Sequence, residues 1–345
     1  MKNRIKEREK GRMPHYVWML SCVCTLLCGL LSYSFDLLFF FVYVAAVALQ
    51  AVLLRFSKPW PCLLFTSAAM VISYAVTASY MQLPLLFAML PAALVLARST
   101  AQGEGRCDTA TSLTWVYAVF GCAALALVLL PALGWDVSDL PASLDRMLAD
   151  AVDEIDAYMT ALHAEAVALY AEMGVQIAPL AAADLREVLV MMASLLPGAF
   201  FAFAFVLSLA TTYLYQLCAT FAGAGLFTLE NVRYRPSAWL AGAYIVSMPI
   251  AFFGGNFRHV FCLVCMNLAV FAMPVFAFGV CRLIPQLLAF MQRVSFGKVD
   301  FIFFTVLLFF FLVSNAVYVL PVLALAYAIY ILKSTFFPRQ KRDRE

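Results

Sequence analysis

Three residues that lie close together in the sequence, His259, Cys262 and Cys265, have side chains that could bind a metal ion or carry thiol redox chemistry. Their spacing spreads the three side chains over about 120° of one helix. A metal site needs a fourth ligand and redox chemistry needs a partner group, and neither is evident in the sequence. The alternative is two small thiols packed inside a membrane below a histidine at its surface.

Signals of other catalytic chemistry are absent from the sequence. It contains no Gly-x4-Gly-Lys-Ser/Thr loop for ATP, no His-Glu-x2-His pair for zinc and no Gly-x-Ser-x-Gly turn for a nucleophilic serine. The chain has only three histidines. We therefore expect a protein that is not an enzyme, with no catalytic residues, no metal site and no cofactor.

The remaining side chains that could form a functional site are neutral amides in the C-terminal part of the chain. Gln216, Asn267 and Asn315 lie in apolar stretches. The four apolar stretches of this part of the chain are each interrupted by a proline, namely Pro197, Pro249, Pro274 and Pro321. Interrupted helices with polar groups nearby can build a ligand site inside a membrane. The three amides are therefore our candidate polar lining of such a site. The alternative is that they only hold helices together through interhelical hydrogen bonds.

The composition of the chain indicates a membrane protein. Of the 345 residues 65% are hydrophobic and only 12% are charged, about half the share of a soluble domain. This excludes a soluble enzyme, a nucleic-acid-binding protein and a disordered chain. We expect an all-α, polytopic transmembrane helical bundle of about 8–10 spans, with the lipid bilayer as its main partner.

The apolar stretches that carry this prediction are long enough to cross a bilayer, which takes about 20 residues. They are residues 15–32, 36–54, 62–80, 84–98, 113–133, 188–217, 237–253, 260–281 and 301–332. The last run would be about 48 Å long as one helix. It could be one tilted span or a hairpin that turns at Ser314-Asn315.

Charge predicts the orientation of the chain in a bacterial plasma membrane. With both ends in the cytoplasm, which requires the hairpin, 20 of the 23 Lys and Arg residues are cytoplasmic. Residues 134–187 hold eleven acids against Arg146 and Arg186, a net charge of −9, and are placed outside. The expected units are N-terminal spans (1–133), an outer insertion (134–187), and C-terminal spans with a basic tail (188–345).

The outer insertion has the pattern of a long amphipathic helix. Its apolar residues follow a 4-3 spacing from Leu144 to Leu169, and Asp145, Asp153 and Asp156 lie on other faces. Such a helix could attract a cationic solute or a protein partner, or lay its apolar stripe on the bundle or on the membrane surface. A second helix is expected to start near Pro179 and to continue into the next span.

The order of features from about Pro197 to Pro321 resembles the YybS-like family of bacterial multi-pass membrane proteins. The resemblance is carried by Pro197, the Pro236-Ser-Ala-Trp239 segment, Asn256 and Leu268-Ala269-Val270. Family members commonly have Gln-Gly before that Leu-Ala-Val, where this chain has Met266-Asn267. The family is distantly similar to the S subunits of energy-coupling-factor importers, which implies small-solute binding and a partner ATPase.

Two functions from different classes follow from the sequence. The first is a small-solute binding or transport subunit without its own ATPase, acting with membrane or ATPase partner subunits. The second is a non-catalytic envelope organiser or sensor that acts through protein partners. A ligand site requires the amides to converge on a space of roughly 300–1,000 Å³, whereas interhelical bonds require only close contact.

Overall fold

The computed structural model describes residues 15–34, 36–56, 59–102, 106–132, 140–172, 182–222, 236–253, 260–281 and 316–336. This part of the chain forms ten α-helices and no β-strand, which confirms the all-α prediction. The helices are α2 (His15–Leu31), α3 (Leu37–Phe56), α4 (Trp60–Thr77), α5 (Leu83–Gln102), α6 (Arg106–Ala132), α7 (Leu140–Glu172), α8 (Ala182–Phe221), α9 (Ala238–Phe253), α10 (Val260–Cys281) and α13 (Ala316–Phe336).

Seven of the described helices are long and apolar enough to cross a membrane, namely α3, α4, α5, α6, α8, α10 and α13. The helices α2 and α9 are also apolar but shorter, with 17 and 16 residues. These nine apolar helices agree with the 8–10 spans expected from the sequence. The multi-pass helical bundle is therefore confirmed.

Some helix ends differ from the apolar stretches that predicted them. The helix α6 begins at Arg106 rather than at residue 113, since its polar first turns continue the helix beyond the apolar segment. The helix α4 ends at Thr77, where Ala78 has a left-handed φ of 51° and caps it through an N–H bond to the Tyr74 carbonyl. Residues 282–315 lie outside the described residues, so the hairpin at Ser314-Asn315 stays a prediction.

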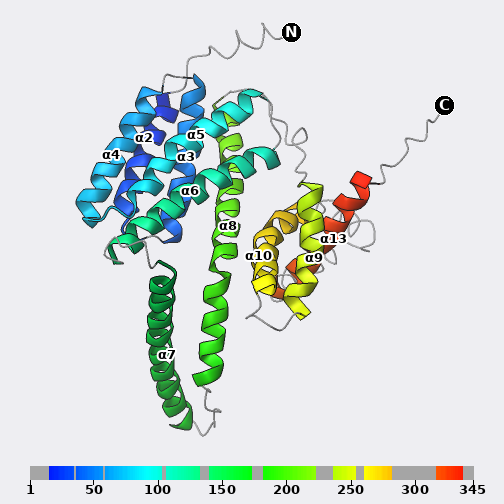
Figure 1. The fold of residues 1–345 in the computed structure, drawn as a ribbon. Coiled ribbons are helices and arrows are strands. Elements are labelled where there is room, and N and C mark those ends of the chain that lie inside the picture. The colour runs from blue at the N-terminus through cyan, green and yellow to red at the C-terminus, as the bar shows by residue number, and fades with distance from the viewer. Residues whose placement is uncertain are drawn as a thin grey trace, which may run out of the picture.

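The helices α2 to α6, here called the N-terminal bundle, pack with one another and against α8 (Figure 1). Small residues allow this close packing: a Cβ atom at Gly29 of α2 would lie 2.5 Å from the Ala69 carbonyl oxygen of α4. Lipid offers no hydrophobic drive for helices to associate, so such close backbone contacts supply much of the attraction.

The helices α9, α10 and α13, here called the C-terminal bundle, share a second core on the other side of α8 (Figure 1). Gly279 of α10 is covered by the ring of Tyr327 from α13, and a side chain at that position would collide with it. The two bundles meet where α10 packs against α8. There Ala110, Phe205, Leu209 and Val275 form a small apolar cluster.

The helix α8 lies between the two bundles and also extends beyond them. Its 40 residues span about 60 Å, twice the thickness of a hydrocarbon core, and its apolar span begins only at Ser194. The part before Ser194 contacts α7, and both helices lie at the end of the molecule away from the described start of α2 (Figure 1). The expected unit boundary between residues 187 and 188 falls inside this continuous helix.

Candidate binding cleft between the two bundles

The side chain of Asn267 bonds to two backbone groups of α8. Its Oδ1 atom accepts the Gly198 N–H at 2.7 Å, and its Nδ2 atom donates to the Ser194 carbonyl at 2.9 Å. In an uninterrupted helix these two backbone groups would bond to each other, because they lie four residues apart. Nδ2 also lies 3.0 Å from the Leu263 carbonyl on its own helix. The amide therefore links α10 to α8.

The Pro197-Gly198 pair explains why α8 accepts these hydrogen bonds. Proline has no N–H and its ring disturbs the preceding turn, so the helix is locally weakened at this point. A Cβ atom at Gly198 would lie 2.6 Å from the Asn267 carbonyl oxygen and 2.9 Å from its Cα atom. Only glycine lets the two helices approach closely enough for these hydrogen bonds.

A cleft of about 570 Å³ adjoins this contact. It lies among α6, α8, α9 and α10, and Figure 1 shows α8 and α10 side by side with α6 and α9 next to them. Along α10 the lining runs from Asn267 to Val275, about 12 Å of helix. The larger lining side chains are Trp115, Phe201, Phe205, Leu240 and Phe271. Trp115 is 63% exposed, so the cleft reaches the surface of the bundle.

Two polar side chains at the cleft, those of Asn267 and Thr114, are already bonded within the protein. Both N–H groups and the oxygen of the Asn267 amide are bonded to backbone. The Thr114 hydroxyl lies 2.7 Å from the Ala110 carbonyl and 3.2 Å from the Ser208 hydroxyl. A polar solute entering the cleft would lose its hydration with few groups to replace it. An apolar molecule has no such loss.

Of the two described residues of the predicted polar lining, one lines this cleft and the other does not. Asn267 lines it, but Gln216 lies 18 residues beyond Gly198 on α8, about 27 Å along the helix. The Gln216 Oε1 atom is buried and has no hydrogen-bond partner among the described residues. Asn315 lies outside the described residues. The two described amides therefore belong to different regions of the bundle.

The constellation of His259, Cys262 and Cys265 is described only in part, because His259 lies outside the described residues. Cys265 is buried and Cys262 half-buried, and both are free thiols. In the part of the chain that the structure describes, no group of three His, Cys, Asp or Glu residues could hold a metal ion.

Sequence reasoning missed a buried amide in the N-terminal bundle. Gln50 of α3 is fully buried, and its Nε2 atom donates to Thr25 of α2 at 3.1 Å and to Thr66 of α4 at 3.2 Å. Its Oε1 atom has no partner. A single amide inside the apolar run 36–54 was the available signal. The aromatic lining of the cleft had no such signal, because phenylalanine is common throughout the chain.

A second, smaller cavity of about 220 Å³ lies within the N-terminal bundle and against α8. Tyr43 and Tyr117 line it, but both hydroxyls are bonded elsewhere. The Tyr43 hydroxyl donates to the Leu85 carbonyl at 2.9 Å, and the Tyr117 hydroxyl lies 3.1 Å from that of Thr211. The smaller cavity is therefore as apolar in character as the main cleft.

Comparisons with protein-family models, with curated proteins and with solved structures returned no match to this chain. The resemblance to the YybS-like family therefore stays a prediction.

Proposed function

We propose that this chain is a membrane-embedded binding subunit whose cleft holds an apolar molecule. The observation that carries the proposal is the cleft of about 570 Å³ between the two bundles, lined mainly by aromatic and aliphatic side chains. Its volume falls within the range of roughly 300–1,000 Å³ that is typical of ligand pockets. Binding, rather than catalysis, is the role that we propose for this cleft.

The aromatic and aliphatic lining, with Asn267 and Thr114 already bonded within the protein, favours an apolar ligand over the polar solute considered from the sequence. A ligand that arrives from water gains about 25 cal/mol for each Å² of apolar surface that it buries. A ligand already dissolved in the bilayer gains no such energy. For that ligand, selectivity comes from shape and close packing against Trp115, Phe201 and Phe271.

Transport is the proposed extension of this binding role. The chain has no ATP-binding loop, so the resemblance to importer S subunits supports a partner ATPase in the same bacterial plasma membrane. The contact between α8 and α10 is the place where such a partner could change the cleft. There Pro197 interrupts α8, and a side chain rather than backbone alone completes the hydrogen bonding.

Two exposed neighbours on α6 allow a matched test. Thr111 lines the cleft, whereas Ser112 does not, and both are exposed. The chain is purified from membranes, and retained small molecules are extracted and identified by mass spectrometry. We expect Thr111→Trp to reduce the retained apolar molecule, and Ser112→Trp to leave it unchanged. Equal retention by both variants, or no retained molecule in the unaltered chain, would contradict the proposal.

A second candidate function, an envelope organiser, is favoured by one observation. The helix α7 lies at the end of the molecule and contacts mainly α8, so much of its surface is free of the described bundle. Its exposed acidic residues, including Asp150 and Asp153, could face a protein partner. Capture of the same protein by the unaltered chain, and its loss after Asp150→Lys, would support this function. Binding that is unaffected by the charge reversal would not.

A further inference from the structure

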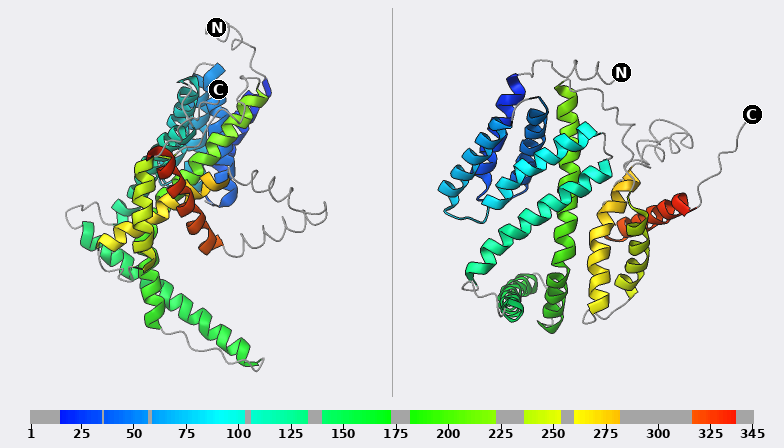
Figure 2. Two further views of the ribbon diagram at one scale, coloured as in Figure 1. Left: turned by 90° about the vertical axis from the view of Figure 1, so that its right-hand side faces the viewer. Right: turned by 45° about the horizontal axis from the view of Figure 1, so that its top comes forward.

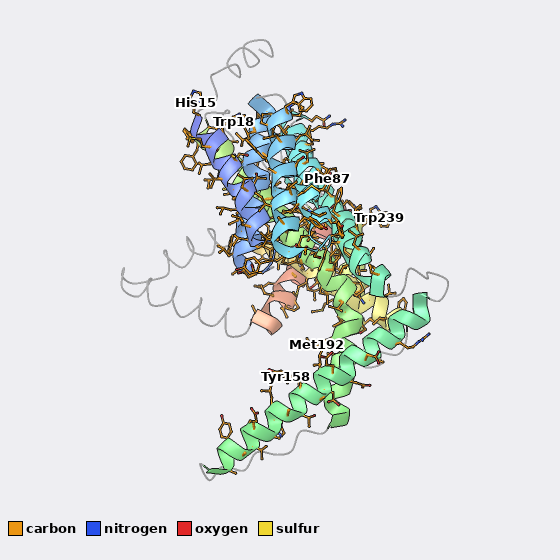
Figure 3. All side chains as sticks on the ribbon, turned by 90° about the vertical axis from the view of Figure 1, so that its left-hand side faces the viewer. His15, Trp18, Phe87, Tyr158, Met192 and Trp239 are labelled. Carbon is orange, nitrogen blue, oxygen red and sulfur yellow. The ribbon has the colours of Figure 1, made fainter. Side chains whose placement is uncertain are left out.

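The helix α7 does not run alongside the transmembrane helices. Two views, the left panel of Figure 2 and Figure 3, show it crossing α8 obliquely at the end of the bundle. The two helices appear side by side only in the view of Figure 1. The apolar span of α8 starts at Ser194, two residues after Met192, which is labelled near α7 in Figure 3. The position of α7 is therefore near the level at which hydrocarbon gives way to water.

One side of α7 carries large apolar side chains that no described helix covers. Ile155, Tyr158 and Leu162 are 45%, 65% and 41% exposed. Their spacing of three and four residues places them on one face of the helix. Asp153 is exposed as well, and the helical period turns it to the opposite face. Exposed Glu154 and Glu165 border this face beside Tyr158, so α7 carries a narrow apolar stripe with acidic residues along one edge and on the opposite side.

The exposed apolar face is turned toward the level of the membrane. In Figure 3 the Tyr158 side chain points from α7 toward the side on which the transmembrane bundle lies. On α8, Met192 and Leu196 are each 59% exposed near the same level, so the apolar surface continues from α7 onto the start of the span. A tyrosine with an apolar ring and a polar hydroxyl is typical of the membrane–water interface.

We propose that α7 is an interfacial helix whose face of Ile155, Tyr158 and Leu162 binds the lipid leaflet on its side of the bundle. The occupant is lipid rather than protein, because the face is continuous with the lipid-facing start of α8 and is directed toward the bilayer. Attachment comes from burial of apolar side chains in the interface. The acidic face repels anionic headgroups and stays in water, so anionic lipid does not strengthen the attachment.

Photo-cross-linking of the full chain in phosphatidylcholine nanodiscs tests this proposal. The photoreactive residue benzoylphenylalanine replaces Tyr158 in one variant and Ala164 in the other. Ala164 is exposed and lies on the side of α7 opposite the apolar face. Both positions are exposed, so neither replacement disturbs a core, and gel filtration confirms that each variant is folded.

We expect irradiation of the Tyr158 variant to add the mass of one phospholipid, and the Ala164 variant to gain severalfold less. Replacing a third of the phosphatidylcholine by phosphatidylglycerol should not raise the yield. A cross-link from position 158 to a second copy or to another segment of the chain would overturn the proposal. So would equal lipid adducts at the two positions, or no adduct at either, which would place α7 in water.

Discussion

The amide of Asn267 bonds to the backbone of a different helix, with its Oδ1 atom 2.7 Å from the Gly198 nitrogen. The two residues are 69 positions apart in the sequence. The same side chain donates to the Ser194 carbonyl, so both backbone groups at the weak point of α8 have partners. Inside a membrane this matters, because water is not available to satisfy them. One side chain thus stabilises α8 and attaches the C-terminal bundle to it.

Replacing Asn267 by Leu should lower the free energy of unfolding by about 1–3 kcal/mol, because the hydrogen bonds that join α10 to the Gly198 N–H and the Ser194 carbonyl of α8 are lost. Denaturant titration of the purified protein in detergent micelles measures this. Gln216→Leu is the control, since the Gln216 Oε1 atom already has no partner. Its effect should be clearly smaller. Equal losses in the two variants would show that the Asn267 bonds contribute little.

Replacing Gly198 by Ala should force α8 and α10 apart, because the added Cβ atom would lie 2.6 Å from the Asn267 carbonyl oxygen. Overpacking of this kind costs about 1–3 kcal/mol. Gly242→Ala in α9 is the matched control, since a Cβ atom there meets nothing within 4 Å. Thermal unfolding should separate the two variants, with Gly242→Ala at or above the unaltered protein. A stable Gly198→Ala protein would mean that the helices adjust without cost.

The hydrogen bond between Gln50 and Thr66 should appear as a measurable coupling in a double-mutant cycle. Interhelical hydrogen bonds in membranes are worth about 0.6 kcal/mol on average, with a maximum near 1.7. Gln50→Leu and Thr66→Val, alone and combined, give this coupling from unfolding in detergent. Thr77→Val replaces Thr66→Val in the control cycle, because the Thr77 hydroxyl bonds to the Ser73 carbonyl instead. Similar couplings in both cycles would refute a specific bond.

The predicted orientation places α7 outside the cell. Asp153 is exposed on α7, and a cysteine introduced there should react with a membrane-impermeant maleimide in intact cells. Arg98 is exposed at the other end of the bundle, near the end of α5, and a cysteine there should react only after lysis. Exposed Cys122 is first replaced by Ser in both variants. The opposite labelling pattern would invert the topology.

Replacing Cys262 or Cys265 should leave the yield of folded protein nearly unchanged. Both are free thiols in the structure, and neither forms a disulfide. Cys265 is buried, so alanine, which is smaller and apolar, is the suitable replacement there, while serine suits half-buried Cys262. Fluorescence-detected gel filtration of membrane extracts measures the yield. Collapse of the folded peak in both variants would restore the metal or redox hypothesis.

Features that depend on the local sequence were predictable. The long apolar stretches predicted where the membrane helices lie. In lipid the backbone N–H and C=O groups of each stretch must bond to one another, and an α-helix provides these bonds. The 4-3 spacing of residues 144–169 predicted the amphipathic helix that the structure has at Leu140–Glu172. Helix ends were less accurate, as at Arg106 of α6. Hydrophobicity shows where lipid begins, but a helix continues into water as long as its backbone bonds are favourable.

Features that depend on how the helices pack were decided only by the tertiary structure. The sequence marked Asn267 and Pro197 as unusual but could not show that they meet, or that Gln216 lies about 27 Å away along α8. It could not show the cleft, because the cleft is lined by residues of four helices that lie far apart in the sequence. The rotation and tilt of each helix are set by contacts of small side chains, such as Gly198 against Asn267 and Gly29 against Ala69. An apolar residue is equally stable against lipid on any face of a membrane helix, so the sequence pattern alone does not determine which face packs against a neighbouring helix.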